Sequence, residues 1–80
     1  MEDLTQILSV RLRQLRYARG WNQEELAHRA GISSRYVGYI ERREGSATVS
    51  VLGKLAHALG VDPCELIKRL QPNEKRARKG

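Results

Sequence analysis

The sequence lacks the residues on which several classes of protein depend. A single cysteine, Cys64, excludes an intramolecular disulfide, and the two histidines, His28 and His57, have no second ligand at metal-binding spacing. No run of about 18 or more residues is apolar, and residues 1–14 carry charges throughout, so we expect neither a membrane span nor a signal peptide. These absences favour a cytoplasmic protein without a metal or any other cofactor.

The chain is strongly basic. Fifteen lysines and arginines against nine acidic residues give a net charge of +6 and a pI of about 10.1, which favours an anionic partner such as nucleic acid. Half of this excess lies in residues 71–80, where four basic residues accompany one acidic residue. Eighty residues suffice for one domain, which we predict over residues 1–70. A basic and disordered tail is predicted over residues 71–80.

Apolar spacing and capping residues predict five short helices, and no segment has the alternation of a strand. N-caps are expected where a short polar side chain precedes an apolar stripe, at Asp3, Asn22, Ser33 or Ser34, Thr48 and Asp62. The helices are expected to end near Gly20, Gly31, Arg43, Gly60 and Pro72. The fourth helix is predicted to bury Val49, Leu52, Leu55, Ala56 and Leu59. The expected fold class is all-α.

Two short helices joined by a tight turn at Gly31 have the layout of a helix-turn-helix, whose second helix enters the major groove of DNA. Because each helical residue turns by about 100°, a Val37 that faces the core leaves Arg35 and Tyr39 nearly opposite it. Gly38 flanks this outward face, although a helical glycine costs about 1 kcal/mol relative to alanine. We interpret Gly38 as a place where the backbone approaches a partner.

Four sequence features over residues 8–70 resemble the DNA-binding domain of the lambda repressor/Cro-like family, of the xenobiotic-response-element type. They are Gln23 in the second helix, the Ala30-Gly31 turn, the Ile40-Glu41-Arg42 end of the third helix, and the segment from Leu55 to Val61. The resemblance implies a five-helix fold in which the second and third helices form the helix-turn-helix. It also implies a sequence-specific regulator of transcription that binds double-stranded DNA.

The resemblance assigns roles to individual residues. The positions that read bases fall on Ser34, Arg35, Gly38 and Tyr39. The positions near the sugar-phosphate backbone fall on Asn22, Gln23, Tyr36, Arg42, Arg43, Ser46 and Thr48. Arg35 can form the bidentate contact with guanine that gives the largest discrimination between bases. Arg16 and Glu41, which both face the core by helical spacing, are implied to form a structural ion pair.

The loop after the third helix departs from the family pattern. Ala47 stands where most members have proline, and Arg43 stands where most have the glycine of a Glu-Arg-Gly sequence. The glycine comes later, at Gly45. The resemblance therefore defines the helices better than the loop between them.

A homodimer is expected, because one small domain contacts too few base pairs to specify a site, and proteins of this kind pair across palindromic half-sites. The fifth helix carries Leu66, Ile67 and Leu70 after the cap at Asp62, and we predict these three residues at the dimer interface. Alternatively, the same residues pack wholly against the first helix. Trp21 is expected to pack into the core, and Cys64 to be a half-buried thiol rather than a redox sensor.

The biological system is left open by the sequence. The size, the basic loop and the Ala-Thr-Val sequence at residues 47–49 are similar to restriction–modification controller proteins, while regulators of phages and conjugative elements are equally open. Glu24 falls in a region that activators of the family use to touch RNA polymerase, so RNA polymerase is an open partner and activation and repression both stay open.

Two other functions compete with DNA binding. An antitoxin-like or protein-interaction module is the alternative, although residues 71–80 lack the apolar segment with which antitoxins usually contact a toxin. An enzyme is not expected, because no nucleophile–base pair or carboxylate pair can be placed on one face.

Overall fold

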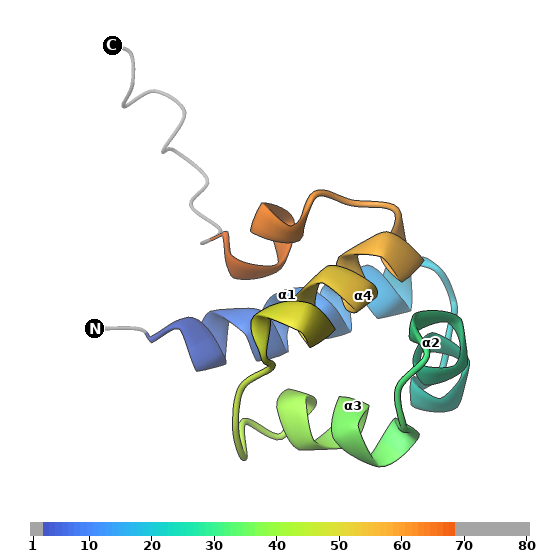
Figure 1. Cartoon of the computed structure of the whole chain (residues 1–80), viewed down its shortest axis with the longest axis horizontal. Helices are drawn as coiled ribbons and strands as arrows, with labels where there is room; N and C mark the ends of the chain where they lie inside the picture. Colours follow the sequence, from blue (N-terminus) through green and yellow to red (C-terminus); the bar gives the residue numbers. More distant parts are fainter. Residues whose placement is uncertain (1–2, 69–80) are drawn as a thin grey trace, which may run out of the picture.

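The computed structural model describes residues 3–68, which form four α-helices and one 3-10 helix without a strand. The elements are α1 (Leu4–Ala18), α2 (Gln23–Ala30), α3 (Ser34–Glu41), α4 (Val49–Leu59) and η1 (Pro63–Ile67). The α2 helix packs against α3 and α4, while η1 packs against α1 and α4 (Figure 1). In that view α3 and η1 lie on opposite sides of the molecule. None of the described helices is long and apolar enough to cross a membrane.

The predicted caps of the four α-helices are present. Each side chain of Asp3, Asn22, Ser33 and Thr48 accepts a hydrogen bond from the backbone N–H three residues later. Gly31 and Gly60 end α2 and α4 with left-handed φ values of 74° and 71°, a conformation that glycine adopts without a steric penalty. The predicted boundaries of these helices are therefore confirmed to within about two residues.

The core is one cluster of apolar side chains from all five elements. Its fully buried large members are Leu12, Leu26, Val37, Ile40, Leu55 and Leu66. Trp21 packs against this cluster, as predicted. Val49, which the sequence predicts to be buried, is instead 87% exposed. The inward face of α4 leaves the core at its first turn, where Leu52 is only half-buried.

The prediction of a fifth α-helix is not confirmed, because the chain forms the short 3-10 helix η1 and is already extended at Lys68. Asp62 caps η1 through the N–H of Cys64, two residues later. Arg11 donates a hydrogen bond of 2.8 Å to the backbone carbonyl of Glu65, so this carbonyl serves α1 rather than a continuing helix. Leu70 and residues 71–80 lie outside the described residues.

Two predictions about η1 need correction. Leu66, predicted at the dimer interface, has no exposed surface and belongs to the chain's own core, because η1 lies against α1 and α4. Cys64, expected to be half-buried, is exposed. The neighbouring carboxylate of Asp62 raises the pKa of Cys64, which disfavours the reactive thiolate.

Candidate nucleic-acid interface

The α2 and α3 helices form the predicted helix-turn-helix. After Gly31 turns the chain, the N–H of Ile32 donates to the carbonyl of Ala27 at 3.0 Å, and Ile32 packs against the core. Ser33 then caps α3. Buried Val37 fixes the rotation of α3, so the face opposite Val37 points to solvent.

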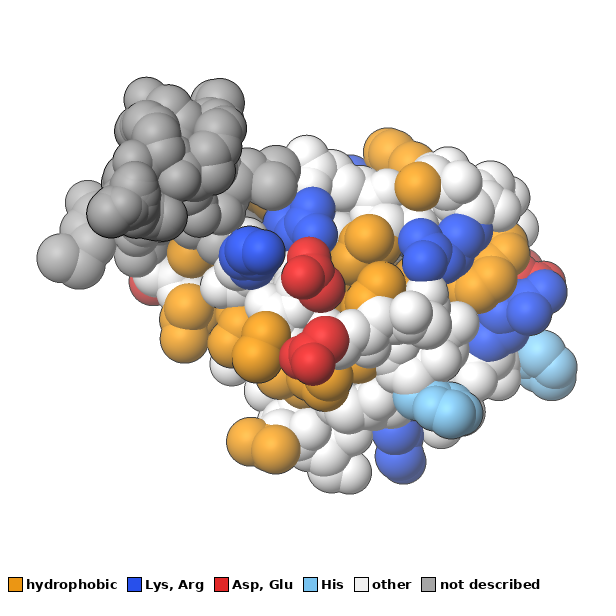
Figure 2. All heavy atoms as spheres, turned by 90° about the horizontal axis from the view of Figure 1, so that it is seen from above, with side chains coloured by type: hydrophobic (Ala, Val, Ile, Leu, Met, Phe, Trp, Pro, Cys, Tyr) orange, Lys and Arg blue, Asp and Glu red, His pale blue; other side chains and the backbone are white. Residues whose placement is uncertain are grey.

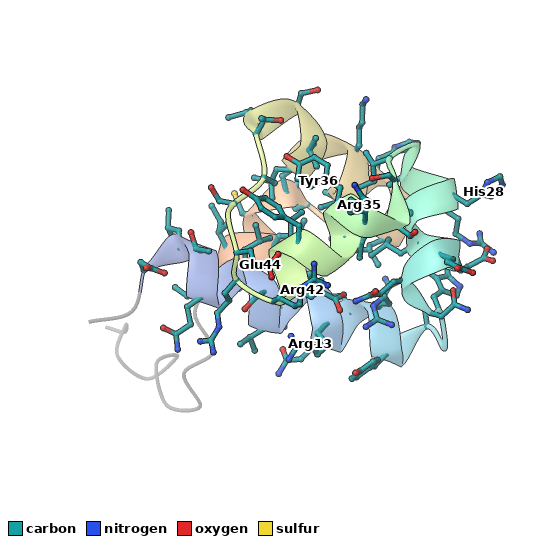
Figure 3. All side chains as sticks on the ribbon, turned by 90° about the horizontal axis from the view of Figure 1, so that it is seen from below. Arg13, His28, Arg35, Tyr36, Arg42 and Glu44 are labelled. Atoms are coloured by element: carbon teal, nitrogen blue, oxygen red, sulfur yellow. The ribbon has the colours of Figure 1, made fainter. Side chains whose placement is uncertain are left out.

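Three of the four candidate base-reading residues are exposed on this outward face. Ser34 and Arg35 are exposed, and Tyr39 is 38% exposed. Figure 3 shows Arg35 and Tyr36 on α3 and Arg42 at the end of the helix. The described residues of α3 therefore present three polar side chains at positions 34, 35 and 39 to a partner.

Gly38 differs from its predicted exposure, because it is buried beneath a side chain of its own helix end. A Cβ at position 38 would lie 2.7 Å from Nη1 of Arg42 and 3.5 Å from Oε1 of Gln23. The glycine thus makes room for a guanidinium group that lies across the outer face of α3. Rotation about the helix could not predict this cover, since it depends on a side chain four residues away.

Tyr39 is held in place by its neighbours. The rings of Tyr36 and Tyr39 are tilted by 54° with their centroids 5.9 Å apart. The Tyr39 hydroxyl lies so close to the backbone of Gly45 that any side chain there would clash with it. This contact explains why the glycine of the loop comes at position 45.

Arg43 has an unusual backbone conformation at the end of α3. Its φ of 61° is the single positive value outside glycine among the described residues. The N–H groups of Arg43 and Glu44 donate to the carbonyls of Ile40 and Tyr39, which closes the helix as a glycine would. Left-handed geometry costs a non-glycine residue about 1–2 kcal/mol, and such strain is typical of functional sites. An exposed arginine in this position is suited to contact phosphate.

The remaining candidate phosphate contacts lie at the starts of α2 and α4. Asn22 and Thr48 are exposed, and their side-chain oxygens already accept from the N–H groups of Glu25 and Val51. Ser46 is also exposed. Gln23 is half-buried, and its side-chain amide donates a hydrogen bond of 3.0 Å to Oε1 of Glu41. The buried carboxylate of Glu41 thus orients this amide.

Arg16 and Glu41 form the expected ion pair between α1 and α3. Two hydrogen bonds of 2.8 Å join the guanidinium to the carboxylate, and the side chains are only 8% and 3% exposed. Burial alone would raise the pKa of Glu41, but hydrogen bonds from Arg16 and Gln23, together with the positive charge of Arg16, hold it below its ordinary value. The ion pair therefore links the core to the N-terminus of α2.

Two residues of this region escaped the sequence analysis. Arg13 donates to the backbone carbonyl of Glu41, and Glu44 accepts two hydrogen bonds from Arg42. The contact of Arg13 joins positions 28 residues apart, and no local pattern indicates it. The spacing of Arg42 and Glu44 gave a local signal, but whether the two side chains meet depends on the turn at Arg43.

An all-α fold with a helix-turn-helix, whose second helix α3 exposes Arg35, is the arrangement of the helix-turn-helix class of DNA-binding proteins. The helix-turn-helix family HTH_3 matches residues 12–66, and the chain belongs to this family of lambda repressor/Cro-like transcriptional regulators. The family consists of DNA-binding regulators and not of enzymes, so the expectation of a non-enzymatic protein is confirmed.

Three similar proteins support this assignment. The transcriptional regulator SutR of Escherichia coli is 48% identical over 61 residues, which are 76% of this chain and 34% of SutR. The solved structure of the hypothetical transcription factor NHTF from Neisseria has a TM-score of 0.80 at 37% identity and covers 94% of this chain and 84% of that one. The restriction–modification controller protein C.AhdI from Aeromonas hydrophila has a TM-score of 0.74 at 40% identity, over 78% of this chain and 94% of that one. The chain thus spans about a third of the length of SutR.

Proposed function

We propose that this chain binds a palindromic operator as a homodimer and controls its own or neighbouring genes. The observation that carries the proposal is the outward face of α3, where Ser34, Arg35 and Tyr39 are accessible to base edges. The candidate phosphate-binding residues flank this face at the start of α2 and after α3. Phosphate contacts position such a domain, and the central side chains specify the sequence.

A hollow of about 200 Å³ between α1, α4 and η1 supports the homodimer. Its lining includes Leu4, Leu52 and Ile67, and Leu4 is 60% exposed. Figure 2 shows hydrophobic side chains gathered at the end of the molecule where α1 begins. Exposed apolar patches of this kind are typical of protein interfaces. A second copy of the chain is the proposed occupant, with Ile67 retained from the predicted interface and Leu66 removed from it.

The likeness to C.AhdI favours a restriction–modification system as the setting, and a mobile element is the other setting we propose to test. Glu24, exposed in the first turn of α2, is available for RNA polymerase if the protein activates transcription. An antitoxin-like module is the alternative function, and it predicts capture of a partner protein in addition to DNA.

Selection of bound duplexes from a random library tests the proposed function. The full-length chain is expected to enrich an inverted repeat whose half-site centres lie about 34–36 Å apart, or a multiple of this distance. Footprinting of the enriched duplex should then protect both half-sites. Enrichment of no sequence over several rounds would contradict sequence-specific regulation.

Replacing Arg35 by alanine is expected to relax sequence preference by about 1–3 kcal/mol, because a bidentate contact with a base edge is lost. Replacing Arg43 by alanine is expected to weaken binding to all sequences alike, because a phosphate contact carries no sequence information. Competition between the selected operator and single-base variants measures both effects. An unchanged preference in Arg35→Ala would remove this residue from base readout.

Replacing Gly38 by leucine is expected to leave the fold intact, since leucine favours a helix by up to about 1 kcal/mol over glycine, and the nearest atoms to a Cβ there are side-chain ends of Arg42 and Gln23 rather than backbone. Operator binding is expected to weaken sharply, because the new side chain displaces Arg42 and holds the backbone of α3 away from DNA. Thermal unfolding and operator titration measure the two effects. Lower thermal stability with unchanged affinity of the folded protein would identify Gly38 as a packing residue.

A further inference from the structure

Glu44 places a negative charge beside the proposed DNA-binding face. Its carboxylate accepts hydrogen bonds from Nε and Nη2 of Arg42 at 3.0 and 3.2 Å, so the pair is bidentate. Figure 3 shows the two side chains together at the end of α3. The third guanidinium nitrogen, Nη1, lies over Gly38. The ion pair with Glu44 therefore holds the guanidinium of Arg42 over α3.

This ion pair contributes little to folding. The two side chains are 56% and 52% exposed, and ion pairs exposed to this degree add little to stability, because water and salt screen the two charges. The hydrogen bonds from Arg42 hold the pKa of Glu44 below its ordinary value, so the carboxylate is ionised at neutral pH. Glu44 adds little stability, yet it pairs with an arginine at the end of α3. We therefore expect its main effect to be on DNA binding.

The effect of Glu44 differs between random and specific DNA. Random duplexes are bound almost entirely through phosphate contacts, and each arginine that neutralises a phosphate strengthens binding by about eightfold when salt is lowered from about 1 M to about 0.1 M. Glu44 pairs with Arg42 and repels phosphates, so it weakens binding to random DNA. A specific duplex brings α3 closer, where an arginine already fixed over Gly38 loses less conformational freedom on binding.

We propose that Glu44 is a specificity-determining residue, which holds Arg42 over Gly38 and thereby lowers the affinity for random DNA more than the affinity for the operator. The proposal rests on the function proposed above, because it presupposes an operator. Glu44 itself touches no base in this proposal and acts by positioning Arg42.

The test compares the full-length chain with Glu44→Gln, which keeps the size of the side chain and removes its charge. The probes are the duplex selected by the wild-type chain and a scrambled duplex of the same length and composition. Glu44→Gln is expected to bind the scrambled duplex about 5–10-fold more tightly, with a salt dependence steeper by about one phosphate contact. Affinity for the selected duplex is expected to rise less than twofold or to fall, so the ratio of the two affinities decreases.

Glu25→Gln is the matched control, since it also breaks an exposed ion pair, with Arg29, and changes the net charge equally. Glu25 lines a different hollow, between α2 and α4. An unchanged affinity ratio in Glu44→Gln, or the same decrease in Glu25→Gln, would overturn the role of Glu44. A wild-type chain that fails to distinguish the two duplexes would instead overturn the proposed function.

Discussion

Replacing Arg16 by methionine is expected to lower the free energy of unfolding by about 3 kcal/mol or more, because Glu41 is then left charged in the core. Glu41 is only 3% exposed, and Arg16 provides its two 2.8 Å hydrogen bonds. Gln23 and the more exposed Arg13 compensate in part. Small domains have stabilities of about 5–15 kcal/mol, so the loss is a large fraction of the total. Urea denaturation followed by circular dichroism measures it.

The double variant Arg16→Met with Glu41→Leu separates pairing from packing. Removing both charges takes away the unpaired carboxylate, so the double variant is expected to be more stable than the sum of the two single losses predicts. Arg29→Met is the control, because it breaks an exposed pair with Glu25 and is expected to change stability by about 0–1 kcal/mol. Additive losses would show that Arg16 and Glu41 are not coupled.

The parts of the fold that the sequence predicts correctly depend on local signals. A short polar side chain such as Asp3 or Thr48 accepts from an N–H three residues away, so its effect can be read within one helical turn. Gly31 and Gly60 adopt left-handed conformations that glycine favours, which marks the helix ends equally well. The expected pairing of Arg16 and Glu41 came from family resemblance, since helical spacing alone places both residues inward without joining them.

The parts that the sequence misses depend on contacts that only the folded chain creates. Helical spacing predicts Leu66 and Ile67 on the same exposed face. However, Arg11 donates a hydrogen bond to the carbonyl of Glu65, 54 residues away, within the short η1. Leu66 is consequently buried by its own chain. The cover over Gly38 likewise requires a turn with Arg43 in a left-handed conformation. Local patterns therefore predict elements better than they predict which surfaces stay free.

The proposed dimer depends on the hollow beside η1, and Ile67→Glu is expected to convert the protein into a folded monomer. Ile67 is half-buried and lines the hollow with Leu4, so a carboxylate there would be buried against apolar groups of a second copy. Without such a copy, the charge can reach solvent and the monomer stays folded. Analytical ultracentrifugation measures the association, and circular dichroism measures the folding.

Operator affinity should fall with dimerisation in this variant. Two linked half-site contacts can strengthen binding by about 10²–10⁴-fold over one, so Ile67→Glu is expected to bind the selected operator at least about 100-fold more weakly. A duplex with a single half-site should bind both proteins with nearly equal affinity, because only one domain contacts it. Val10→Glu is the control, since Val10 is 41% exposed and lies on α1 outside the hollow. It introduces the same charge and should leave the dimer and its operator affinity unchanged. If Ile67→Glu remains dimeric, the two copies meet through another surface.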